Sequence, residues 1–394
     1  MPSARDIAHE LAIAARIAAR GLRRRLSGDT PRFASAREFR AALEPWLVAL
    51  PNGLLRDQAF FSIPANEPWL DTGLNLEPGD SVTLLAHGRV YLSRALDIWA
   101  DPSLRLWCRV GETGAVFRGT RATHTFTARG QGRLWLASRF PGEWLDPHGR
   151  ASAKDREFAR ASGDLSVLVL RWAPGTDVPA LFRGFETDAQ APRPVLAEAA
   201  RQAQSVPLPE HWHHHWRIGA NEIFRPALAP DGRPAFGCHT HHDVGILRRE
   251  VRAPLVPGLR LQWSWRVDEL PSSLAEDTLP SHDYVSIGVE FDDGQDVTYY
   301  WSAALPEGTV FRCPLPVWRQ IETHVVVRSG STGLGRWSIE ERDVYADYRR
   351  IVSGPACEVT GVWLLANSVL QRGHGRCEYA SIRLISDERT LEVL

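Results

Sequence analysis

The sequence has almost no lysine, because Lys154 is the only residue among its 46 lysines and arginines that is not an arginine. A phosphate-binding loop, a Schiff base and a serine–lysine dyad each need a lysine, and the residues around Lys154 form none of these motifs. The charges nearly cancel, since 46 basic and 47 acidic residues leave a formal net charge of −1. Such a chain has no overall field that attracts nucleic acid, so we expect no nucleic-acid partner.

Cysteines are also few. The five are odd in number, widely spaced and without a C-x-x-C pair, which argues against a disulfide framework and fits a reducing compartment. No apolar run is long enough to span a bilayer, and arginines interrupt the alanine-rich N-terminal segment where a secretory signal would be apolar. We therefore expect a cytoplasmic protein. The sequence also lacks a G-x-S-x-G elbow and a G-x-G-x-x-G loop after a strand.

Two helices are predicted at the N-terminus. Residues 3–26 place a mainly alanine stripe on one helix face and arginines on the other. Such a helix can pack on its own protein or lie on an anionic membrane surface, and the weak apolar face favours the first. Residues 35–50 form the second helix, with Ser35 as N-cap and Pro51 after its end.

From Trp69 onward the pattern changes to the period of two that is typical of strands. In the first half, strands are predicted over 81–86, 104–110, 122–128, 132–137 and 165–171. Six prolines between 174 and 210 surround one helical segment near 195–204, which indicates a linker with a short helix. Strands return after residue 211, over 259–268, 284–291, 295–302, 321–328, 359–367 and 378–385. Short strands without helices between them predict β-sandwiches.

Residues 69–172 resemble the galactophilic, calcium-dependent bacterial lectins. The resemblance lies in LEPGDSVTLLAHGRVYLS (76–93), LWCRVGETGAVFRG (106–119) and GRLWLASRFPGEW (132–144). It implies a jelly-roll fold. Where that family has its calcium-binding Asn-Asp pair, this chain has Ser138-Arg139, and a cationic side chain would repel the ion. We therefore expect neither the calcium nor the sugar site of that family.

Residues 211–385 resemble an uncharacterised bacterial β-sandwich domain family of unknown function. The resemblance lies in three segments: LRLQWSWRVDELP (259–271), HDYVSIGVEFDDGQDVTYYWSAALP (282–306) and VVVRSGSTGLGRWSIEERDVYADY (325–348). The resemblance implies a concanavalin-like sandwich and no particular chemistry. The predicted fold is thus all-β, with helices over 1–50, a lectin-like jelly roll over 51–173, the linker over 174–210 and a concanavalin-like β-sandwich over 211–394.

The hairpin 284–302 predicts its own register. A three-residue loop, Asp292-Asp293-Gly294, places Glu290 opposite Asp296 and gathers all apolar side chains on one face, whereas a two-residue loop would mix the faces. If strands 259–268 and 321–328 join the same sheet, the other face carries ten polar or aromatic side chains. These are Gln262, Arg266, Asp268, Tyr284, Glu290, Asp296, Tyr300, Glu322, His324 and Arg328.

This polar face suits a carbohydrate, because carboxylates and amides bind sugar hydroxyls and tyrosine offers a stacking surface. Catalysis would use the pair Glu290 and Asp296, or His324, Tyr300 and Arg266 as the proton-transfer and charge-neutralising set of a lyase. The remaining residues would then bind the ligand: Gln262, Asp268, Tyr284, Glu322 and Arg328. A solvated outer face with cross-strand ion pairs is the alternative without function.

Histidines concentrate between residues 211 and 242. On a strand, His239, His241 and Asp243 would share one face, and two imidazoles with a carboxylate can bind a divalent metal. Hydrogen-bonded surface histidines are the alternative. Cys313 is expected to be a buried structural thiol. The sequence thus predicts a two-module, lectin-like protein that binds a small glycan or glycoside. A glycoside hydrolase or uronate lyase is the alternative, and whether the protein is an enzyme stays open.

Overall fold

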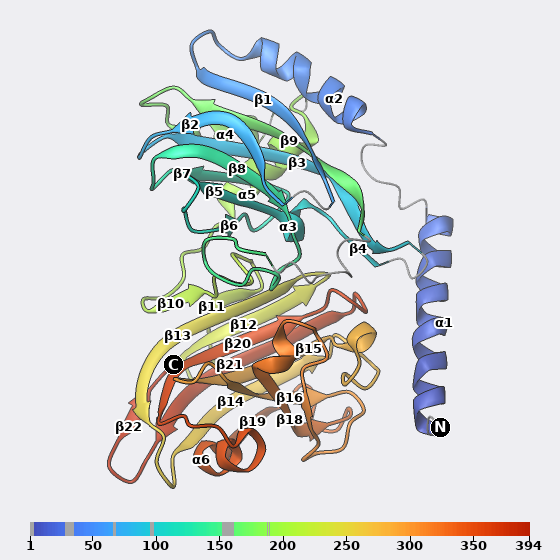
Figure 1. The fold of residues 1–394 in the computed structure, drawn as a ribbon, viewed down its shortest axis with the longest axis vertical. Coiled ribbons are helices and arrows are strands. Elements are labelled where there is room, and N and C mark those ends of the chain that lie inside the picture. Colours follow the sequence, from blue (N-terminus) through green and yellow to red (C-terminus); the bar gives the residue numbers. More distant parts are fainter. Residues whose placement is uncertain are drawn as a thin grey trace. The chain divides into compact units, whose positions relative to one another are not determined.

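A computed structural model describes residues 4–27, 35–65, 68–94, 98–151, 161–186, 188 and 190–394. The chain forms two compact units, which we call the N-terminal unit (Ala15–Val206) and the C-terminal unit (Met1–Ala14 with Pro207–Leu394). Both are mainly β, and their four sheets form two sandwich-like bodies (Figure 1). Lys154 lies outside the described residues.

Both predicted N-terminal helices form, as α1 (Ala4–Ser27) and α2 (Ala36–Ala49). The Ser35 hydroxyl caps α2 by accepting the Glu38 N–H at 3.2 Å. The stripe of α1 faces solvent, because Ile7 and Leu11 are 47% and 65% exposed. Contact with a membrane surface through residues 3–26 therefore stays a prediction. Among the described residues, no helix is both long and apolar enough to cross a membrane.

The N-terminal unit contains a five-stranded and a four-stranded sheet. The first runs β1-β9-β3-β4 with β7 paired to β3, and the second runs β2-β8-β5-β6. Their bounds are β1 Leu55–Pro64, β2 Leu70–Leu76, β3 Ser81–Ser93, β4 Ile98–Ala100, β5 Leu106–Val110, β6 Phe117–Arg118, β7 Thr123–Thr127, β8 Gly132–Ser138 and β9 Ser162–Trp172, with a helical turn α3 at Pro102–Arg105. All five strands predicted in this region form, as β3, β5, β7, β8 and β9.

The five-stranded sheet is covered on both faces. Val82, Leu84 and Ala86 of β3 point into the core between the two sheets, as their alternation predicts. Leu85, on the opposite face, packs in a second cluster that contains residues of α2, α4 (Val178–Phe185) and α5 (Arg193–Ala203). The proline-rich segment therefore holds two helices rather than the one predicted. Pro179 and Pro194 stand in the first turns of these helices, where a missing N–H costs nothing.

The C-terminal unit also has two sheets. A seven-stranded sheet runs β10-β13-β20-β15-β16-β18-β17, and a six-stranded sheet runs β11-β12-β21-β14-β19 with β22 paired to β21. Their bounds are β10 Trp212–His214, β11 Phe224–Leu228, β12 Pro234–His241, β13 Val244–Pro254, β14 Arg260–Glu269, β15 Tyr284–Phe291, β16 Asp296–Ser302, β17 Val310–Arg312, β18 Glu322–Ser329, β19 Trp337–Asp343, β20 Glu358–Asn367, β21 His374–Ile385 and β22 Thr390–Glu392. Short helical segments lie at η2 Leu279–Ser281, η3 Trp318–Gln320, α6 Val344–Asp347 and η4 Tyr348–Val352.

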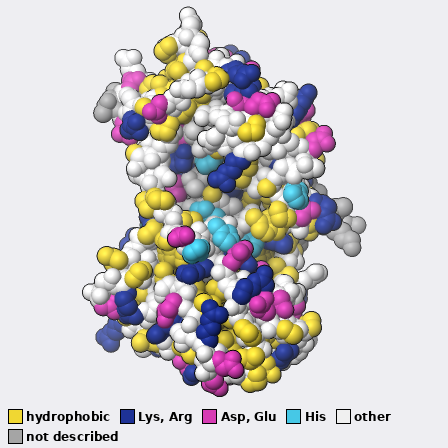
Figure 2. Space-filling model, turned by 90° about the vertical axis from the view of Figure 1, so that its left-hand side faces the viewer, with side chains coloured by type: hydrophobic (Ala, Val, Ile, Leu, Met, Phe, Trp, Pro, Cys, Tyr) yellow, Lys and Arg dark blue, Asp and Glu magenta, His cyan; other side chains and the backbone are white. Residues whose placement is uncertain are grey.

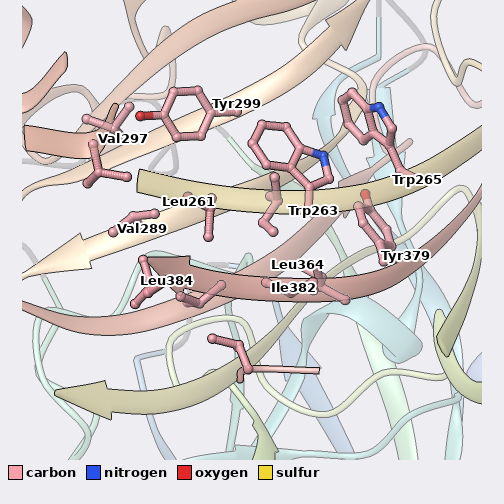
Figure 3. Packing of buried hydrophobic residues seen from close by; sticks show 14 of the residues in the cluster. Leu261, Trp263, Trp265, Val289, Val297, Tyr299, Leu364, Tyr379, Ile382 and Leu384 are labelled. Carbon is pink, nitrogen blue, oxygen red and sulfur yellow. The ribbon is translucent and has the colours of Figure 1, made fainter. Parts of the chain in front are cut away.

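Aromatic side chains fill the core between these two sheets. The ring of Trp263 in β14 stacks on Tyr299 of β16, with centroids 5.7 Å apart (Figure 3). The ring of Trp265, also in β14, lies beside Trp301 and Tyr379. The predicted register of the hairpin is confirmed, because Glu290 pairs with Asp296. Gly294, the last residue of its loop, has the left-handed φ of +77° that the predicted turn requires.

Candidate functional site

The ten residues of the predicted polar face do not share one sheet. Gln262, Arg266 and Asp268 lie on β14, which pairs with β19 and β21 in the six-stranded sheet. The other seven residues lie on β15, β16 and β18 of the seven-stranded sheet. The expectation of a single sheet was wrong, because alternation shows which side chains of a strand share a face but not which strands are neighbours. The structure thus separates Arg266 from the other predicted catalytic residues.

Arg328 leaves the predicted face as well. The ladder between β16 and β18 shifts by one residue, so that Tyr300 is opposite Val326 whereas Trp301 is opposite Arg328. A shift of this kind turns the following side chains to the other side of the sheet. Arg328 therefore lies beside Trp301, and its Nε donates to Glu340 Oε1 at 2.7 Å. It therefore does not lie on the same face of β18 as His324.

The polar face of the seven-stranded sheet is covered by protein. Side chains from segments 272–283 and 303–321, such as Ala275, Leu305 and Trp318, form a second apolar layer over it. The predicted residues beneath that layer are at most 3% exposed: Tyr284, Asp296, Tyr300, Glu322 and His324. Neither the predicted open cleft nor a solvated outer face exists here. The segments that cover the strands carry no periodic pattern, so the sequence did not indicate this burial.

Under this cover the side chains form a polar network around Glu322. Its Oε1 accepts hydrogen bonds from the Tyr284 hydroxyl at 3.2 Å and the Thr298 hydroxyl at 3.1 Å, and lies 3.5 Å from His324 Nε2. Burial opposes the ionisation of Glu322, but the neighbouring His324, His282 and Cys313 side chains outweigh it and lower its pKa to about 2. Burial, with the carboxylates of Glu322 and Glu290 nearby, raises the pKa of Asp296 well above its usual value. Of the two carboxyl groups, Asp296 is therefore the one that keeps its proton.

Glu290 and Glu276 complete the acidic groups of this face. Glu290, at the rim, forms an ion pair with Arg248 at 2.7 Å. Glu276, in the covering segment, accepts the Ala303 N–H at 2.7 Å and the Ser302 hydroxyl at 2.5 Å, and burial raises its pKa to about 7. No sequence pattern indicated Glu276, because it lies in a loop without periodicity.

Two further buried residues were also not predicted as functional. His282 precedes β15 and Cys313 follows β17, and the Cys313 Sγ lies 3.4 Å from His282 Nε2. Both are less than 1% exposed. The only sequence signal was their proximity to strand ends, where side chains of neighbouring strands converge.

The outer face of the six-stranded sheet, in contrast, is open. We call it the β14 face and define it by Gln262, Arg266 and Asp268 of β14 with Trp337 and Glu341 of β19 and Glu378 and Arg383 of β21, which pair across the ladder. The Arg266 guanidinium contacts Asp268 at 3.0 Å and Glu378 at 3.3 Å and lies 6.0 Å from the Trp337 ring. The Arg266, Asp268 and Glu378 side chains are 27–36% exposed. This face is therefore polar and accessible to solvent.

Three histidines continue the β14 face along β12 and β21. The ring of His374 stacks on His241 at 3.9 Å, and His239 Nε2 lies 3.3 Å from His374 Nδ1. Asp243 is not with them, because the strand ends at a left-handed residue, His242 (φ +57°), and the Asp243 carboxylate accepts the Thr240 hydroxyl at 2.6 Å. The predicted set of His239, His241 and Asp243 therefore does not form. One face of the molecule shows histidines gathered beside arginine and acidic side chains (Figure 2).

Comparisons with known proteins confirm the resemblance of the C-terminal half. Residues 212–383 match the model of a family described as a protein of unknown function (DUF3047). None of the curated proteins matches the chain.

Solved structures give distant matches to lectins and carbohydrate-binding modules. The EclA N-terminal domain, a PllA-like lectin, has 18% identity over 31% of this chain and 99% of its own, with a TM-score of 0.23. The xyloglucanase domain of NopAA from Sinorhizobium fredii, in complex with cellobiose, has 10% identity over 43% of this chain and 87% of its own, with a TM-score of 0.28. TmCBM61, in complex with β-1,4-galactotriose, has 10% identity over 45% of this chain and 90% of its own, with a TM-score of 0.24. Values this low carry no inference about function.

Proposed function

We propose that the protein binds a glycan or glycoside on the β14 face and does not catalyse a reaction of that ligand. The observation that carries this proposal is the exposure of that face: of the two predicted groups of polar residues, only the one on β14 is open to a ligand. Gln262, Arg266 and Asp268 are three of the residues that the sequence predicts for ligand contact or charge neutralisation.

The chemistry of the β14 face suits sugar hydroxyls. Asp268 and Glu378 supply acceptors beside the Arg266 donors, in a geometry that allows bidentate contact. Trp337 offers an aromatic surface next to them, and sugar rings pack well on indole. Each of these side chains already has a protein partner, so the site is preorganised and a ligand would exchange hydrogen bonds with it.

Binding is favoured over catalysis because the predicted acid/base residues do not meet on an accessible surface. Glu290 and Asp296 are cross-strand neighbours, but Asp296 is 1% exposed and Glu290 is held by Arg248. The lyase set is divided between two sheets, since Arg266 lies on the β14 face and His324 is buried in the other sheet. Neither group is therefore assembled where a polysaccharide could contact all of its members.

We further propose that the N-terminal unit is a lectin-like jelly roll and the C-terminal unit a concanavalin-like sandwich, so that the chain carries two lectin-like modules. The support is the pairing of two facing sheets around one apolar core in each unit. Ser138 and Arg139 lie at and just after the end of β8, and the Arg139 side chain is close to Glu143 (3.8 Å). This basic group argues against a calcium site there.

The proposed function is tested with a panel of neutral and uronate-containing oligosaccharides. We expect at least one member to raise the melting temperature of the protein and to leave its own mass unchanged after incubation. Arg266→Ala and Trp337→Ala should each weaken that binding about tenfold or more. The matched control is Arg252→Ala, which removes an exposed arginine paired with Glu358 away from the β14 face and should bind as the parent does. Products of altered mass would show an enzyme instead.

A further inference from the structure

Three potential metal ligands converge under the cover of the seven-stranded sheet. His282, Cys313 and His324 each offer one ligand atom, and these three atoms lie within 4.8 Å of one another. All three residues are less than 1% exposed. They come from distant parts of the sequence, so no local spacing motif points to them.

The backbone fixes where these side chains lie. His324 is on β18, and Cys313 is held beside that strand because its N–H donates to the Glu322 carbonyl at 3.1 Å. His282 follows the turn η2, and its carbonyl accepts the Asn367 side-chain amide at 2.7 Å. Three separate elements are thus anchored so that their side chains meet at one point.

The hydrogen bonds leave ligand atoms available at that point. The Nδ1 of His282 donates to the Glu276 carbonyl at 2.6 Å, so its Nε2 carries the lone pair and faces Cys313. A backbone carbonyl on the far ring nitrogen is the usual support of a metal-binding histidine. Neither ring nitrogen of His324 makes a hydrogen bond, although both are buried. A buried imidazole with two unsatisfied nitrogens is unfavourable unless something else occupies the space beside it.

A thiol–imidazole hydrogen bond between Cys313 and His282 accounts for only part of this arrangement. It satisfies the 3.4 Å contact but gives His324 no hydrogen bond, and the Glu322 Oε1 that lies 3.5 Å from His324 Nε2 gives it none either. Phe311 stacks on the His324 ring at 5.0 Å, and Tyr284 meets it edge-on at 5.0 Å. These contacts explain the orientation of the ring, but they give its two nitrogens no hydrogen bond. A cation among the three ligands accounts for all of these features.

We propose that His282, Cys313 and His324 bind one Zn²⁺ ion, with Glu322 beside them as the fourth ligand. Tetrahedral zinc with bonds to nitrogen and sulfur separates its ligand atoms by about 3.3–3.8 Å. The contact of Cys313 with His282 already has this length, at 3.4 Å, and Glu322 Oε1 is 3.5 Å from His324 Nε2. A small inward movement of the three ligands completes the geometry.

The ligand types select the ion. Two imidazoles and a thiolate are borderline-soft ligands, which favour zinc and disfavour magnesium and calcium. The Tyr284 and Thr298 hydroxyls donate to Glu322 and hold its carboxylate in place. Because all four side chains are buried, the site has no open position, as in structural zinc sites. The ion would join segment 272–283 and the residue that follows β17 to β18. Binding releases the Cys313 thiol proton to solvent.

The test uses the full-length chain, freed of metal by a chelator and then titrated with Co²⁺ as a spectroscopic probe and with Zn²⁺ in competition. We expect one Co²⁺ per chain, the absorption of a four-coordinate site, a thiolate-to-cobalt charge-transfer band, and its displacement by one Zn²⁺. Cys313→Ser should abolish the charge-transfer band, and Glu322→Gln should weaken Zn²⁺ binding 10- to 100-fold. Cys357→Ser, which removes an exposed cysteine, is the matched control and should keep the band.

The exposed histidines need their own control, because His239, His241 and His374 could take up the ion without a thiolate. A His241→Asn/His374→Asn double variant should leave the charge-transfer band unchanged. If Cys313→Ser does not fold, the proposal is tested on the parent chain by thiol alkylation in mild denaturant. Zn²⁺ should protect Cys313 from alkylation and leave the alkylation of Cys357 unaltered. Absence of the thiolate band in the parent chain, its persistence in Cys313→Ser, or equal alkylation of Cys313 with and without Zn²⁺ would each overturn the proposal.

Discussion

Glu276 links the stability of the C-terminal unit to pH. Its carboxylate is 1% exposed in the segment that covers the seven-stranded sheet, and burial raises its pKa from the ordinary 4.5 to about 7. The folded protein therefore binds a proton at Glu276 more tightly than the unfolded chain does. This contribution to stability is fully present below pH 4.5, where both states are protonated, and is lost as the pH rises through 7.

The size of the effect follows from the two pKa values. A difference of about 2.5 units corresponds to roughly 3 kcal/mol, most of which is lost between pH 5 and pH 8. Glu276→Gln keeps the shape of the protonated side chain but cannot ionise. The variant should therefore be less sensitive to pH than the parent, and more stable than it at pH 8 by about 2–3 kcal/mol.

The assay is urea unfolding of parent and variant at half-unit steps from pH 5 to pH 8.5, at constant ionic strength. Glu307→Gln, which neutralises an exposed acid in the other covering segment, is the matched control and should follow the parent. Parallel curves for the parent and Glu276→Gln over the whole range would refute the reasoning, because they would show that Glu276 ionises equally in the folded and unfolded chain.

Three further substitutions test the packing. Gly288→Ala should destabilise the C-terminal unit by about 3 kcal/mol or more, since the added Cβ would lie 1.7 Å from Trp363 Nε1; thermal melting measures this, and an unchanged melting temperature would contradict the packing described. Gly184→Ala, in α4 with no atom within 4 Å of the new Cβ, should instead be neutral or stabilise by up to about 1 kcal/mol in the same experiment. Arg171→Ala should cost the N-terminal unit about 3 kcal/mol in urea unfolding, because it leaves the Asp80 carboxylate without its 2.6 Å partner; a loss below about 0.5 kcal/mol would show that the ion pair does not matter.

The strands could be predicted well where apolar residues alternate. In the hairpin 284–302, segregation of side chains to two faces was enough to set the pairing of Glu290 with Asp296, because a shift of one residue would bury charges in the core. The N-cap of α2 at Ser35 was predicted for a similarly local reason, since its own hydroxyl accepts the Glu38 N–H of the first turn.

What the sequence did not predict depends on contacts between distant segments. Nothing in the alternation of β14 distinguishes pairing with β15 from pairing with β21, so the placement of Arg266 was wrong. The bulge that turns Arg328 away from His324 adds one residue without a visible signal in the pattern. His282 and Cys313 meet only because loops fold over the sheet, and loops have no periodicity from which that can be inferred. The cytoplasmic location stays a prediction.

The most direct test of the proposed function is calorimetric titration of the parent chain, Arg266→Ala and Arg252→Ala with the oligosaccharide that most raises the melting temperature. Glycan binding on the β14 face predicts saturable binding by the parent and by Arg252→Ala, and binding at least about tenfold weaker by Arg266→Ala. Equal affinity in all three proteins, or no saturable binding to any member of the panel, would contradict the proposal and leave the β14 face as a solvated row of ion pairs.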